Sequence, residues 1–74
     1  MELHWKDVEK GLKKMGWHQV GSRGDHFYFK HPEIPGKVTV PHYKSIGSGA
    51  LSRILLPTGV RPDEFVRKYV RGER

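Results

Sequence analysis

Hydrophobic residues near the start of the chain recur three and four residues apart. The positions that follow this spacing are Trp5, Val8, Leu12 and Met15. Such spacing puts side chains on one stripe of an amphipathic helix, so it predicts a helix over residues 5–15 with one buried side. Gly16 follows the stripe, where a glycine commonly ends a helix in a left-handed conformation.

The pattern then changes to a strict alternation. Between residues 24 and 32, the apolar residues Phe27 and Phe29 alternate with polar residues. Successive side chains of a strand point to opposite faces of its sheet, so this segment predicts a strand with one buried and one exposed face. The exposed face would carry His26, Tyr28 and Lys30.

A strand is predicted on each side of this one. Residues 17–23 alternate imperfectly, with Trp17 and Val20 as the expected buried positions. Residues 36–41 also alternate, and their two faces carry the apolar pair Val38 and Val40 and the polar pair Lys37 and Thr39. Because glycine and proline separate the three segments, we expect a three-stranded antiparallel meander.

Two short helices are predicted after the sheet. The first covers residues 49–56 and is closed by Pro57, whose ring would clash with a further turn. The second begins at Pro62, with Phe65 and Tyr69 as its buried anchors. The predicted fold is therefore α+β, in the order α-β-β-β-α with a short additional C-terminal helix.

The size and composition of the chain restrict its class. With 74 residues we expect a single domain spanning 1–74, and the absence of cysteine excludes disulfides and thiolate metal sites. No stretch approaches the ~20 apolar residues of a membrane span, and no signal-peptide apolar region is present, so we expect a cytoplasmic protein without a membrane partner. The formal charge of +6 favours a polyanionic partner, although a solvated basic surface with no special partner stays open.

The common catalytic and metal-binding motifs are missing from the sequence. No histidine or carboxylate pair has the spacing of a metal site, and no glycine-rich loop followed by lysine could hold a phosphate. We therefore expect neither a metal nor a small-molecule cofactor.

His26 remains as the candidate for chemistry. It shares its predicted face with Lys30, Lys37 and Tyr28, and it follows Asp25. Metal-free RNA cleavage needs a group that takes or gives protons and cations that stabilise the phosphate, roles that histidine and lysine can fill. The alternative is a surface histidine near a turn that is hydrogen-bonded to Asp25.

The ordered set of short motifs resembles the HicA-type mRNA interferase toxins, a small bacterial and archaeal family also called YcfA-like. The resemblance covers about residues 3 to 66. The motifs that carry it are Lys6-Asp7-Val8, Met15-Gly16-Trp17, Gly24-Asp25-His26, His31-Pro32, Val38-Thr39-Val40-Pro41, Gly49-Ala50-Leu51-Ser52-Arg53-Ile54-Leu55, Gly59-Val60 and Glu64-Phe65.

This resemblance implies a fold like the double-stranded RNA-binding domain. It also implies a ribosome-independent ribonuclease that cleaves mRNA and is inhibited by a HicB-type antitoxin. In the family, a Gly-Ser-His or similar tripeptide at the start of the second strand carries the catalytic histidine, which corresponds to His26 here. Asp25 stands in place of the common serine, where two roles stay open: orienting the imidazole, or repelling a nearby phosphate. His4 stands where serine or threonine often caps the first helix.

We therefore predict a toxin ribonuclease with His26 as general acid/base. Lys30, Lys37 and Arg53 are the expected RNA contacts, and Tyr28 is the expected stacking platform for a base. The antitoxin is expected to cover this basic sheet face. Two alternatives stay open: a non-catalytic double-stranded RNA-binding module, and a homologue that binds only the antitoxin.

Overall fold

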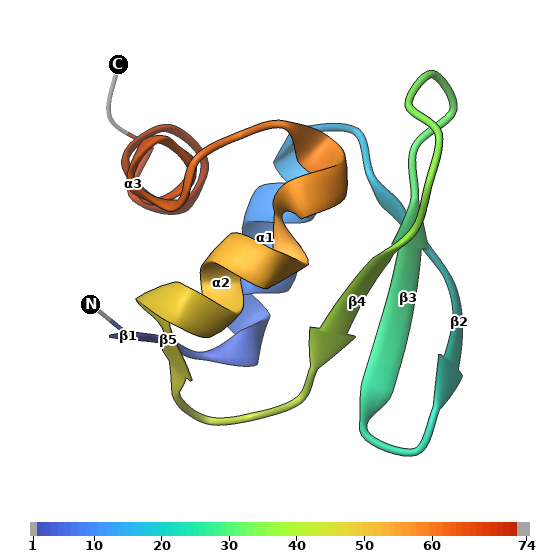
Figure 1. Cartoon of the computed structure of the whole chain (residues 1–74), viewed down its shortest axis with the longest axis horizontal. Coiled ribbons are helices and arrows are strands. Elements are labelled where there is room, and N and C mark those ends of the chain that lie inside the picture. Colours follow the sequence, from blue (N-terminus) through green and yellow to red (C-terminus); the bar gives the residue numbers. More distant parts are fainter. Residues whose placement is uncertain (1, 73–74) are drawn as a thin grey trace.

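The computed structural model describes residues 2–72 and shows a helical layer against a three-stranded sheet (Figure 1). Strands β2 (His18–Arg23), β3 (His26–Lys30) and β4 (Val38–Pro41) form an antiparallel sheet in the order β2-β3-β4. Helices α1 (Trp5–Lys14) and α2 (Ser48–Ile54) pack on one face of this sheet. The predicted α-β-β-β-α order is confirmed.

The remaining elements complete the helical side. Short strands β1 (Glu2–Leu3) and β5 (Ile46–Gly47) form a separate antiparallel pair that the sequence did not predict. After α2, a 3-10 turn η1 (Leu56–Thr58) leads to α3 (Pro62–Phe65), which continues as the π-helical turn η2 (Val66–Val70). Within residues 2–72, every helix is too short or too polar to span a lipid bilayer.

Both ends of α1 are fixed by the residues that the sequence singled out. His4 is the N-cap, and its Nδ1 accepts a hydrogen bond from the Lys6 backbone N–H at 3.1 Å. Gly16 has a φ of +95° and ends the helix, with the Trp17 N–H donating to the Leu12 carbonyl at 3.0 Å. This 6→1 bond is typical of a Schellman motif, so the predicted glycine stop is confirmed.

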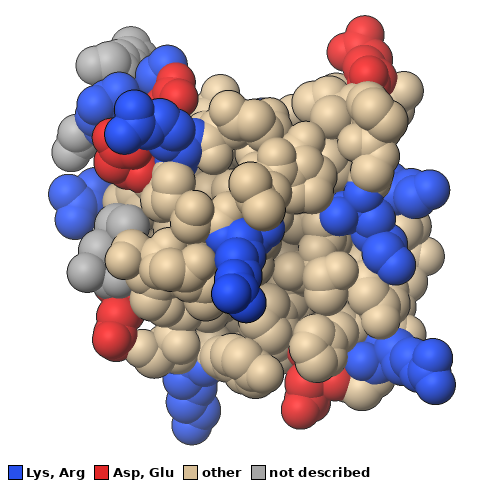
Figure 2. Space-filling model, in the orientation of Figure 1, with Lys and Arg blue, Asp and Glu red and all other residues tan. Residues whose placement is uncertain are grey.

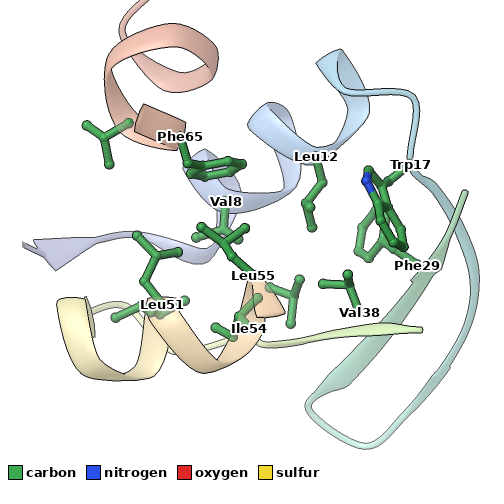
Figure 3. Close-up of a cluster of buried hydrophobic side chains, with 12 residues drawn as sticks. Val8, Leu12, Trp17, Phe29, Val38, Leu51, Ile54, Leu55 and Phe65 are labelled. Atoms are coloured by element: carbon green, nitrogen blue, oxygen red, sulfur yellow. The ribbon is translucent and has the colours of Figure 1, made fainter. Parts of the chain in front are cut away.

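The core joins the inner face of the sheet to the helices. Figure 3 shows it running from Trp17 and Phe29 near the sheet, past Leu12, to Phe65 of α3. Phe65 packs so closely on α1 that a Cβ at Gly11 would lie 2.4 Å from the Phe65 ring. The glycine inside α1 is therefore required by this contact.

Two details of the sequence prediction are wrong. Val20 was expected in the core but is 58% exposed, because the pairing of β2 with β3 shifts between Gln19 and Gly21 and leaves Val20 without a partner in the register. The helix predicted over residues 49–56 ends at Ile54, and Leu56 lies in η1 with an exposed side chain.

Candidate functional site

His26 is the first residue of β3, and its side chain is exposed. Its cross-strand partners are Arg23 of β2 and Pro41 of β4. Phe29 is fully buried and Phe27 is partly buried, which shows that these alternate residues of β3 face the helices. The imidazole of His26 therefore lies on the face of the sheet that the helices leave open.

A two-residue turn, Gly24-Asp25, joins β2 to β3 at this corner. Gly24 has a φ of +60°, a left-handed value, and glycine at the first turn position is typical of the II′ hairpin turn. The Asp25 carbonyl accepts a hydrogen bond from the His42 backbone N–H at 2.8 Å. The turn sets its two flanking residues, Arg23 and His26, directly opposite each other.

The structure brings some of the predicted RNA-contact residues together and separates others. The Lys37 ammonium lies 4.4 Å from the centroid of the Tyr28 ring, a cation–π contact. Lys30 shares a face with His26 but lies four residues further along β3, about 13 Å at roughly 3.3 Å per residue. Arg53 is exposed on α2, in the layer that covers the other face of the sheet.

Two further residues of the open face escaped the sequence prediction. Arg23 lies opposite His26, and His18 lies opposite Lys30; both are exposed. Figure 2 shows basic side chains at two places along the margin of the molecule where β2 and β3 lie. The sequence did hold a signal for Arg23, because a two-residue hairpin turn pairs the residues on either side of it.

The opposite face of the same corner holds a largely buried imidazole. The His42 ring is stacked between Trp5 and Phe27, at centroid distances of 3.6 and 3.5 Å and interplanar angles of 8° and 9°. Its Nε2 lies 2.7 Å from Oε2 of Glu9 on α1, and these side chains are 19% and 10% exposed. A carboxylate so far from water needs a partner, and His42 supplies it.

The five histidines are thereby divided into two groups. His4 caps α1, His42 contacts the buried carboxylate, and His31 is hydrogen-bonded to backbone groups through both ring nitrogens. His18 and His26 are exposed on the open face. No three His, Asp or Glu side chains among residues 2–72 are grouped so that they could hold a metal ion.

The fold and this corner together define a small α+β domain that presents a histidine beside a cation on an open sheet face. Residues 5–60 match the model of a protein family described as the HicA toxin of bacterial toxin-antitoxin. The match covers more than half of the 74 residues, from α1 to just beyond η1, and the chain belongs to this family. It is therefore a toxin of a toxin–antitoxin system, whose partner is an antitoxin. The search of curated proteins found no match.

Proposed function

We propose that this toxin is a metal-independent endoribonuclease that cleaves mRNA, with His26 as its general acid/base. The observation that carries the proposal is the position of His26, which is exposed on the open sheet face and paired across the strands with Arg23. An imidazole can take and give protons near neutral pH, and a neighbouring cation can stabilise the charge of a phosphate.

The chemistry uses the RNA's own 2′-hydroxyl as the nucleophile. His26 takes the proton of this hydroxyl as the 2′-oxygen bonds to the adjacent phosphorus. The bond from phosphorus to the 5′-oxygen of the next nucleotide breaks, and His26 returns a proton to that oxygen. The products are a 2′,3′-cyclic phosphate and a 5′-hydroxyl, and every proton is accounted for without a metal.

The other predicted residues of the open face would hold the rest of the RNA. Lys30 would contact a phosphate at a distance from the cleaved bond, because it lies about 13 Å from His26 along the strand. Tyr28 would stack on a base, as aromatic side chains commonly do with single strands. The Lys37 ammonium covers the Tyr28 ring in this structure, so a base can stack on Tyr28 only after Lys37 moves away. The displaced ammonium would then be free to contact a phosphate. Arg53, on α2, would reach only RNA that extends past the sheet.

The antitoxin is proposed to be of the HicB type and to cover the open face. Such a complex would hide His26 and neutralise the basic side chains together. Asp25 is proposed to orient the imidazole, since it adjoins His26 in the turn. We also propose a cytoplasmic location, where mRNA is the accessible substrate.

Cleavage of a labelled single-stranded RNA by the purified protein in EDTA tests the function. We expect His26→Ala to lower the cleavage rate by about 10²–10⁴-fold, the usual contribution of a general acid/base. His18→Ala is the matched control, because it removes an exposed histidine from the same sheet face at the far end of the strand pair, opposite Lys30. At saturating RNA it should cleave at the rate of the unmodified protein. Equal cleavage by His26→Ala, or RNA binding without cleavage by the unmodified protein, would overturn the proposal.

A further inference from the structure

Arg23 is a cation that the fold places directly beside His26. It is the last residue of β2 and faces His26 directly across the Gly24-Asp25 turn. Directly opposed residues of an antiparallel pair have Cβ atoms about 4.5–5.5 Å apart and point to the same face. The guanidinium and the imidazole can therefore reach a single phosphate group from adjacent positions.

The guanidinium of Arg23 is also available for a ligand. Arg23 is exposed, and it takes part in none of the ion pairs within residues 2–72. Its planar fork of N–H donors matches two phosphate oxygens at once, which a lysine ammonium cannot do with the same geometry. The two-residue turn keeps this donor beside the histidine.

The lysines of the open face are placed differently. Lys30 lies about 13 Å from His26 along β3 at roughly 3.3 Å per residue, and Lys37 contacts Tyr28. A general acid/base must lie within about 2.6–3.2 Å of the oxygen that it serves, so the cleaved phosphate has to sit against His26. Only a cation beside His26 can then contact the non-bridging oxygens of that phosphate.

We infer that Arg23 is a second catalytic residue, which binds the non-bridging oxygens of the phosphate being cleaved and stabilises the charge that they gain as the 2′-oxygen attacks. The inference rests on the proposed ribonuclease function. In it, His26 transfers the protons and Arg23 transfers none. The pair accounts for the cation that the chemistry requires without a metal.

The experiment compares Arg23→Ala with Lys30→Ala, which removes the same charge from the same face at a greater distance. Single-turnover cleavage of a labelled RNA at a series of RNA concentrations separates the maximal rate from the concentration giving half of it. We expect Arg23→Ala to lower the maximal rate by about 10²–10³-fold, as loss of one donor to a developing oxyanion does. Lys30→Ala should mainly raise the half-saturating concentration.

Two further readouts separate a catalytic from a structural role. Arg23→Lys should recover part of the lost rate, because it restores the charge without the fork. The pH profile of the remaining rate in Arg23→Ala should keep the shape of the unmodified protein's profile, since His26 still transfers the protons. Thermal melts should be unchanged, because the side chain is exposed.

The inference is wrong if Arg23→Ala cleaves at the unmodified maximal rate, or if it loses no more of that rate than Lys30→Ala. Those results leave the proposed function standing as long as His26→Ala is inactive. Failure of the proposed function would show differently, as full cleavage by His26→Ala.

Discussion

His26 and His42 lie at the same corner of the sheet but on opposite faces. The His42 N–H donates to the carbonyl of Asp25, the residue before His26, and the His42 ring stacks on Phe27, the residue after it. His26 is exposed, whereas the His42 side chain is 19% exposed and contacts Glu9. One histidine is thus accessible to solvent on the open face, and the other is packed against its neighbours on the inner face.

These contacts indicate that the buried His42 supports the position of the exposed His26. His42 contacts both chain neighbours of His26, the carbonyl of Asp25 and the ring of Phe27, and Glu9 links His42 to α1. Loss of the outer ring should therefore affect activity alone, while loss of the inner ring should affect stability first. Four substitutions test this division, and they follow in order of decreasing expected effect.

The largest effect is expected when His26→Ala is measured for both properties. The cleavage rate should fall by about 10²–10⁴-fold, while the free energy of unfolding should stay within about 0.5 kcal/mol, because the side chain is exposed. Urea titration and the cleavage assay on the same preparation check both. A large loss of stability in His26→Ala would contradict the division.

His42→Ala should have the opposite profile. It removes a ring packed between Trp5 and Phe27 and leaves the carboxylate of Glu9 without its partner. We expect a loss of about 2–4 kcal/mol in the free energy of unfolding, in the range for truncating large buried side chains and breaking buried pairs. Adding Glu9→Gln to His42→Ala separates the lost ring packing from the cost of the unpaired carboxylate. The neutral amide should reduce the loss in the free energy of unfolding. Unchanged stability in His42→Ala would show that the stack contributes nothing.

Much of this division could be predicted from the sequence, and the rest could not for physical reasons. The alternation around Phe27 and Phe29 was enough to orient His26, because facing follows from local backbone geometry. The Glu9–His42 contact joins residues 33 apart, and no local period records such a pair. Val20 was misplaced because a β-bulge changes the register that an alternation assumes.

A third substitution tests whether a change in packing on the inner face, with no change of charge, is enough to lower the free energy of unfolding. A Cβ at Gly11 would lie 2.4 Å from the Phe65 ring, so Gly11→Ala should destabilise the protein by about 1–3 kcal/mol despite the better helix propensity of alanine. Gly49→Ala is the matched control in α2, where a Cβ would meet nothing within 4 Å. The control should be stabilised by up to about 1 kcal/mol. Equal gains in both variants, measured by urea titration, would contradict the packing argument.

The smallest effect is expected at an exposed counterpart of the Glu9–His42 pair. The Lys68 ammonium donates to Oε2 of Glu64 at 2.8 Å, one helical turn away. This hydrogen bond, with the charge of Lys68, lowers the pKa of Glu64 from its ordinary value of 4.5, and the same contact raises the pKa of Lys68 from 10.5. Water surrounds both groups, so the pair should stabilise the fold only slightly.

The pH dependence of Glu64→Gln isolates this contribution. Because the folded pKa of Glu64 is depressed, its stabilising effect is present above pH 4.5 and is lost as the pH falls through the folded value. Because the folded pKa of Lys68 is raised, the stabilisation that Lys68 contributes is present below pH 10.5. That stabilisation is lost as the pH rises through the folded pKa of Lys68. Glu64→Gln should therefore melt slightly below the unmodified protein at pH 7, with the gap closing toward pH 3 and shrinking in high salt. If Glu64→Gln lowered the melting temperature as much as His42→Ala does, burial would not distinguish the Glu64–Lys68 pair from the Glu9–His42 pair.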